Sequence, residues 1–158
     1  MLIARKLIFY VILLMSFADI QFISARQDKQ LPSLKYPESS QELEAEKINA
    51  IFHDVENALS PNDIDLLTQH IFKQVKLTLR DAENGYFSEN QAIYIIKNYF
   101  ATHKVVNFKF TLSRISGEPP FATGGGYWNI KGKQEKFQVY ITVTECDKRW
   151  VLAQFIIY

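Results

Sequence analysis

The chain has little of the chemistry that marks many functional classes. Its 158 residues include one cysteine, Cys146, so no disulfide can form within the chain. Lys and Arg number 18 against 17 Asp and Glu, a formal net charge of +1. The sequence has neither a basic stripe nor an acidic tail, which argues against nucleic-acid binding and against a charged disordered tail.

Cysteine and histidine form no catalytic or metal-binding pattern. Cys146 precedes a predicted turn at 147–149, and no histidine lies near it in sequence. His53, His70 and His103 are not spaced as metal ligands. We therefore expect an inert thiol, histidines at the surface or the core boundary, and no metal or cofactor.

No apolar run is long enough to span a membrane, and the longest apolar run predicts an export signal. Arg5 and Lys6 precede the apolar run 7–15, and small residues follow it. This is the layout of a secretory signal peptide, and the run is about half the ~20 residues that a membrane span needs. We expect residues 1–25 to be a signal peptide, cleaved after Ala18 or Ala25. The mature protein would be exported to the periplasm or secreted, without a membrane anchor.

Apolar and aromatic residues are plentiful, at 47% and 14% of the sequence, enough for one packed domain. Residues 26–40 are polar, carry Pro32 and Pro37, and show no periodicity, so they read as a linker. Residues 41–158 are predicted to form a single domain.

Three helices are predicted in the first half of this domain. Ser39 and Glu42 form a capping box that starts a helix ending near Leu59. Its apolar stripe consists of Leu43, Ile48, Ile51, Phe52, Val55 and Leu59. A second helix is expected over about 61–71, with Ser60 as its N-cap. A third follows a second capping box, Ser88 with Gln91, and ends near residues 102–103.

Strands dominate the remainder. A short strand is expected at 75–79, and residues 86–87 are extended. Four successive strands then follow, at Phe108–Ile115, Phe121–Lys131, Lys136–Cys146 and Arg149–Ile157. Their short connections favour neighbouring antiparallel pairing. The fold class is therefore α+β, with helices packed on a mainly antiparallel sheet.

The last strand is apolar on both faces. Strict alternation places Trp150, Leu152 and Ile156 on one face, and Val151, Phe155 and their neighbours on the other. Helices can cover only one of these faces. We therefore expect a homodimer through the outer face of the sheet.

The order of elements resembles the nuclear transport factor 2-like fold, a cone of helices on a curved sheet that is also described as cystatin-like. The residues that carry a closer resemblance are Tyr86-Phe87-Ser88-x-x-Gln91-Ala92, Ile96-x-x-Tyr99-Phe100, Phe108, Gly124 to Gly126, Phe137-x-Val139-Tyr140 and Gln154-Phe155-x-Ile157. This succession is similar to a family of small exported proteins of Gram-negative bacteria, known as a domain of unknown function. The three consecutive glycines depart from the family pattern and predict a bulge or kink in their strand.

Candidate ligand-contacting residues follow from this resemblance. In a cone fold Tyr99 and Trp128 could line a cavity between helices and sheet, with Phe108 and Phe110 beside them, although ordinary core packing is the better explanation of these aromatics. Gly124-Gly125-Gly126 lacks the Lys-Ser/Thr and the following helix of a phosphate loop.

Two functions remain open from the sequence, and a third, a purely structural homodimer module, is hard to separate from the first of them. The first is a non-enzymatic exported domain that binds a small ligand or an envelope protein. The alternative is an isomerase- or dehydratase-like enzyme, whose chemistry needs a buried carboxylate or histidine in the cone. No inward-facing strand position carries such a group, so no catalytic residue is predicted.

Overall fold

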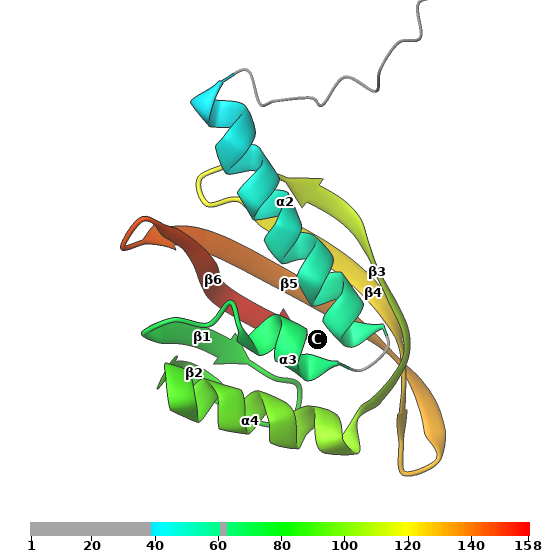
Figure 1. The fold of residues 1–158 in the computed structure, drawn as a ribbon. Helices are drawn as coiled ribbons and strands as arrows, with labels where there is room; N and C mark the ends of the chain where they lie inside the picture. The colour runs from blue at the N-terminus through cyan, green and yellow to red at the C-terminus, as the bar shows by residue number, and fades with distance from the viewer. Residues whose placement is uncertain (1–38, 61–62) are drawn as a thin grey trace, which may run out of the picture. The chain divides into compact units, whose positions relative to one another are not determined.

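The computed structural model describes residues 39–60 and 63–158, and the predicted signal peptide and most of the predicted linker lie outside them. The elements follow the predicted order (Figure 1): α2 (Ser40–Leu59), α3 (Ile64–Thr68), β1 (Gln74–Thr78), β2 (Asn84–Ser88), α4 (Glu89–Thr102), β3 (Lys104–Arg114), β4 (Phe121–Ile130), β5 (Lys133–Cys146) and β6 (Arg149–Ile157).

The strands form one mixed sheet in the order β2-β1-β6-β5-β4-β3. Consecutive strands from β3 to β6 pair antiparallel, as predicted, whereas β1 pairs parallel with β6. This one parallel pair joins the β1–β2 hairpin to the long meander. In Figure 1, α2 lies across the meander, and α3 and α4 lie toward the β1–β2 end. The predicted α+β class is confirmed.

The long first helix begins where the capping residue predicts. The Ser39 hydroxyl accepts a hydrogen bond from the backbone N–H of Glu42, 3.2 Å away. The buried stripe of α2 runs from Ile48 to Leu59 and faces the sheet. Leu43, predicted in this stripe, is exposed instead, because it lies in the first turn, beyond the part of the helix that the sheet covers.

The second helix is shorter than predicted. It spans only Ile64–Thr68, and its N-cap is Asp63 rather than Ser60. Ser60 belongs to the end of α2, where its backbone N–H bonds to the carbonyls of Glu56 and Asn57. The third helix begins as predicted, since the N–H and hydroxyl of Ser88 both donate to Gln91 Oε1, at 3.1 and 2.8 Å.

The glycines of β4 allow β3 to approach unusually closely. A Cβ atom on Gly124 would lie 2.1 Å from the carbonyl oxygen of Lys109, and one on Gly126 would lie 2.0 Å from that of Asn107. Real Cβ contacts are never this short, so only glycine fits at these two positions.

The predicted bulge lies on the partner strand. β4 pairs with β5 without a register shift, whereas β3 carries extra residues, Val106 and Thr111, on either side of its contact with the glycines. The glycine strand therefore stays regular, and β3 bends around it.

A third irregularity corrects the predicted faces of the last strand. Thr142 pairs with Gln154 and Val143 with Leu152, so Ala153 is an extra residue in β6. The bulge reverses the alternation, and Leu152 and Phe155, predicted on opposite faces, are both buried in the same core.

The outer face of the sheet keeps some apolar character. Phe121 stacks on Tyr140 with ring centroids 5.7 Å apart, and Ile156 pairs with Tyr140 across the strands. Tyr127 and Tyr158 are 37% and 59% exposed. The homodimer through this face stays a prediction.

We predict that Gly126→Ala destabilises the protein by about 2–3 kcal/mol, because the new methyl group forces β3 away from β4. Urea unfolding of the purified protein measures this difference. Gly85→Ala is the matched control, since its Cβ would meet only Phe87 ring carbons at 3.6 Å, and it should change stability by less than about 1 kcal/mol. Equal stabilities of the two variants would contradict the close-approach account.

Candidate functional site

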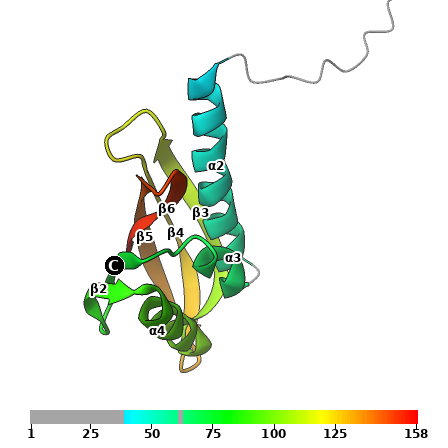
Figure 2. The ribbon, with the colours of Figure 1, turned by 60° about the vertical axis from the view of Figure 1, so that its left-hand side comes forward.

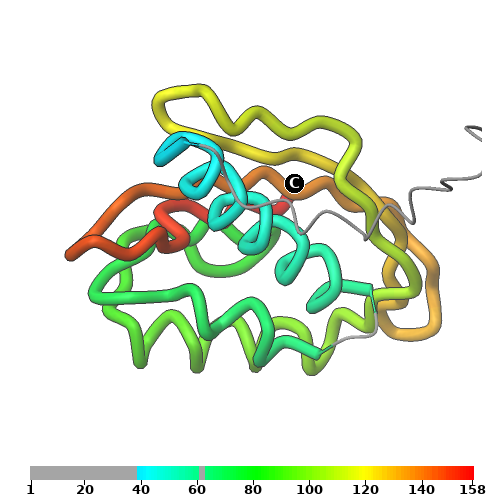
Figure 3. Tube along the Cα trace, turned by 45° about the horizontal axis from the view of Figure 1, so that its top comes forward, coloured from blue at the N-terminus to red at the C-terminus, as the bar shows by residue number. Residues whose placement is uncertain are grey.

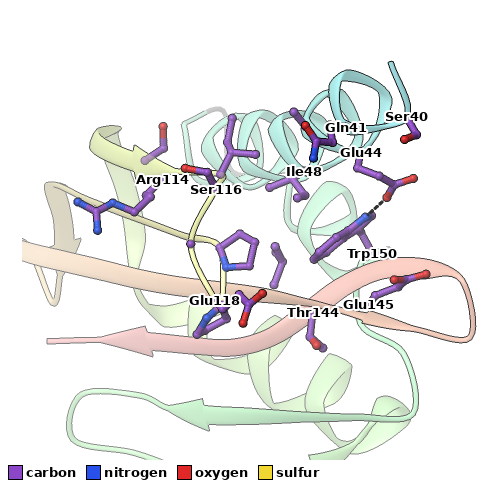
Figure 4. Close-up of a pocket in the computed structure, with 17 residues that line it drawn as sticks. Ser40, Gln41, Glu44, Ile48, Arg114, Ser116, Glu118, Thr144, Glu145 and Trp150 are labelled. Carbon is purple, nitrogen blue, oxygen red and sulfur yellow. Dashed lines mark hydrogen bonds between the residues drawn. The ribbon is translucent and has the colours of Figure 1, made fainter. Parts of the chain in front are cut away.

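A groove of about 1050 Å³ opens between the first half of α2, the β3–β4 connection and the β5–β6 end of the sheet. The views in Figures 1 and 3 agree that the β3–β4 connection lies alongside the first turns of α2. The lining residues come from four parts of the chain (Figure 4): Ser40, Gln41, Glu44, Ala45 and Ile48 of α2, Ser113 to Pro120 of the β3–β4 region, Val143 to Glu145 of β5, and Trp150 of β6.

Trp150 is the only aromatic side chain among these lining residues, and a carboxylate holds it in place. The indole N–H donates a short hydrogen bond to Glu44 Oε2, drawn as the dashed line in Figure 4. Lys47 Nζ lies 2.8 Å from the other oxygen, Glu44 Oε1. The side-chain hydrogen bond from Lys47, and then that from Trp150, hold the pKa of Glu44 below its ordinary value. The ionised form of Glu44 is therefore the one that fixes the indole.

β3, the edge strand that leads into the other side of the groove, is hydrogen-bonded to α2. The backbone N–H of Phe110 donates to Glu56 Oε2 at 2.7 Å, and the Ser60 hydroxyl donates to the carbonyl of Phe108 at 3.3 Å. Figure 2 shows α2 running alongside β3. These bonds pair groups of an edge strand and hold β3 against α2. They fix α2 and β3 relative to each other, and the groove lies between the first half of α2 and the β3–β4 connection.

The lining carries more negative than positive groups. Glu44, Glu118 and Glu145 come from three different elements, against one cation, Arg114. Arg114 extends away from Trp150 in Figure 4, and its guanidinium lies 5.9 Å from the ring of Phe121. The part of the groove around Trp150 is therefore acidic and apolar.

The four aromatic residues predicted to contact a ligand lie elsewhere. Trp128 is 0%, Phe108 4% and Tyr99 6% exposed, and Phe110 is half-buried against the same core. Phe137 stacks on Trp128 with ring centroids 4.4 Å apart, and on Phe108 at 5.7 Å. None of the four lines the groove, and their role in ligand binding stays a prediction.

Tyr99 has its hydrogen bond satisfied within the protein. Its hydroxyl donates to the backbone carbonyl of Arg80 at 3.2 Å, and His103 stacks on its ring at 3.9 Å. Burial raises the pKa of Tyr99 to about 12. The buried indole N–H of Trp128, by contrast, has no hydrogen-bond partner among the described residues.

Two arrangements were missed from the sequence. His70 Nε2 lies 2.8 Å from Asp54 Oδ2 and links α2 to the segment after α3, although 16 residues separate them. The groove itself was missed because Trp150 and Glu44 are 106 residues apart. The visible signals were the apolar faces of the last strand, one of which carries Trp150, and the polar first turns of α2.

Neither a metal site nor a membrane helix is found where the chain is described. Residues 39–60 and 63–158 contain no group of three or more His, Cys, Asp or Glu side chains that could hold a metal ion. None of the helices in these ranges is long and apolar enough to cross a membrane. Cys146 is a free thiol.

Solved structures place the fold among nuclear transport factor 2-like proteins. A ketosteroid isomerase-like protein from Erwinia carotovora atroseptica is 12% identical, with a TM-score of 0.59 over 72% of this chain and 94% of that one. A nuclear transport factor 2-like protein of unknown function from Shewanella oneidensis is 14% identical, with a TM-score of 0.50 over 71% and 96%. At such identities the likeness shows the fold alone.

The chain belongs to the family described as Domain of unknown function (DUF4783), whose pattern matches residues 52–157. A member of that family from Bacteroides ovatus is 14% identical, with a TM-score of 0.53 over 66% of this chain and 90% of that one. No curated protein sequence matches. The family resemblance and the cone fold predicted from the sequence are both confirmed.

We predict that the Trp150 indole N–H resonance titrates with a midpoint below the ordinary glutamate pKa of about 4.3, since protonation of Glu44 weakens its hydrogen bond. Because the pKa of Glu44 is lowered by folding, its stabilising contribution is present above the ordinary value and is lost as the pH falls through the lowered one. ¹H–¹⁵N spectra recorded from pH 7 to pH 2.5 measure the midpoint.

Glu44→Gln is the control for this titration, because an amide oxygen still accepts a hydrogen bond and does not titrate. The variant should lose the acid-range shift of the Trp150 resonance. An identical titration in Glu44→Gln would show that another group causes it.

Proposed function

We propose that this protein is a non-enzymatic binding domain that takes a small ligand in the groove beside Trp150. The observation that carries the proposal is the fixed indole of Trp150 on the wall of an open groove. Ligand sites are typically concave and mostly apolar, with a few oriented polar groups. The groove offers an apolar floor, formed by Ala45, Ile48, Ile115, Val143 and Pro120, and polar groups at its rim.

The position of the ionisable groups favours binding over catalysis. Isomerase-type chemistry in a cone needs an acid or base poised in the cavity, usually with a tyrosine that stabilises an oxyanion. Glu118 and Glu145 are exposed at the rim, and the Tyr99 hydroxyl is bonded to Arg80 away from the groove. Glu44 holds Trp150 and Lys47 with its two oxygens.

An isomerase-like activity is the alternative function. A similar structure is that of a protein named a putative isomerase, from Bacillus subtilis, at 13% identity and a TM-score of 0.58. This likeness concerns the fold. Such an activity in the groove would need a carboxylate as its acid or base. Glu44 could serve only after its hydrogen bond to the Trp150 indole is broken.

The groove proposal predicts that Ala45→Trp blocks binding, because the large side chain fills the space beside Ile48. The neutral apolar dye N-phenyl-1-naphthylamine serves as the probe, and its fluorescence should report at least tenfold weaker binding to the variant. Ala50→Trp makes the same change on the exposed side of α2 and should bind the dye like the native protein. Equal binding by all three proteins would contradict the proposal.

We also propose that the mature protein acts after export, as the pattern of residues 1–25 predicts. N-terminal sequencing of the protein recovered from the periplasm should begin at Asp19 or Arg26. Leu13→Arg interrupts the apolar run and should leave the unprocessed precursor in the cells. A chain that keeps Met1 in the native protein would contradict export by cleavage.

A further inference from the structure

We propose that the ligand of the groove is an amphipathic cation: an apolar body bearing one ammonium group. This inference rests on the proposed function, since it names the class of ligand for the same groove. It is drawn from the aromatic face of Trp150, the carboxylates around it and the direction of Arg114.

The indole of Trp150 is half-buried, packs against the core and lines the groove. Its N–H is already bonded to Glu44, so the group left for a ligand is the ring face. The face of an indole attracts a cation within about 6 Å of its centroid, and tryptophan is the best of the aromatic side chains in this role. The protein uses the same contact elsewhere, since the Arg80 guanidinium lies 4.6 Å from the Trp128 ring.

The charges around this face favour a positive ligand. Glu118 and Glu145 line the groove from the β3–β4 connection and from the end of β5, and neither makes an ion pair within residues 39–60 and 63–158. The cation that lines the groove, Arg114, is directed to Phe121. Opposite charges at the rim attract an ammonium group, and the same field repels a carboxylate.

Lys47 does not remove this preference. Its ammonium lies 2.8 Å from Glu44 Oε1, on an exposed side chain that does not line the groove. It neutralises Glu44, which leaves two carboxylates in the lining, Glu118 and Glu145, against the one guanidinium of Arg114. The apolar part of the ligand would lie over Ile48 and Val143 on the groove floor.

The test compares three compounds with one apolar chain and different head groups: nonyltrimethylammonium, 1-nonanol and nonanoate. Each is titrated into the protein while the Trp150 indole resonance is followed, with the Trp128 resonance as an internal reference. Trp150→Phe assigns the two peaks. We expect the ammonium compound to bind about tenfold more tightly than the alcohol, and the carboxylate to bind most weakly.

A charge variant separates the carboxylates from the aromatic face. Glu118→Gln with Glu145→Gln should weaken nonyltrimethylammonium binding about tenfold and leave nonanol binding unchanged. Glu46→Gln with Glu83→Gln removes the same charge from exposed positions outside the groove and should change neither.

The possible outcomes are distinct. If nonanol or nonanoate binds as tightly as the ammonium compound, the groove remains a binding site and the cationic ligand is overturned. If the dye binds but none of the three compounds moves the Trp150 resonance, the cationic ligand is overturned as well. If Ala45→Trp leaves dye binding unchanged, the proposed function itself fails.

Discussion

The close approach of β3 to β4 is the constraint on which the rest of this structure depends. The backbone carbonyls of Asn107 and Lys109 occupy the space that side chains at positions 126 and 124 would fill. Two extra residues in β3 accompany this contact, and the strand bends around its neighbour. Phe108 then stacks on Phe137, which stacks on Trp128. Between β3 and the glycines of β4, backbone contact therefore replaces side-chain packing. The stacked aromatic rings fill the core next to this contact.

The groove follows from the attachment of α2 to this bent edge. Glu56 and Ser60 bind the backbone of β3 near the middle of the strand, whereas the first turns of α2 lie opposite the β3–β4 connection. Trp150 lies between them, fixed by Glu44. The two ends of α2 thus have different roles, since one seals the core and the other leaves an open wall. The same fold therefore contains a closely packed aromatic core and, beside the first half of α2, an open groove.

Local patterns predicted the elements well, because capping and alternation act over a few residues. Ser39 and Ser88 marked helix starts, and the four-strand meander was recognised from period-two alternation. Leu152 and Phe155 were predicted on opposite faces, but the bulge at Ala153 places both in the same core. A period-two sequence pattern gives no sign of one extra residue, so the bulge could not be predicted. Trp150 with Glu44, and His70 with Asp54, depend on tertiary contacts between distant segments. The candidate site could not be predicted for the same reason.

The location of the ligand site is the central claim, and a crystal structure of the protein soaked with a panel of small apolar and amphipathic fragments tests it most directly. Fragments should collect against Trp150, between α2 and the β3–β4 connection. The rings of Tyr99, Trp128 and Phe137 should keep their mutual packing. Fragments seated among those three rings, with the groove empty, would contradict the account.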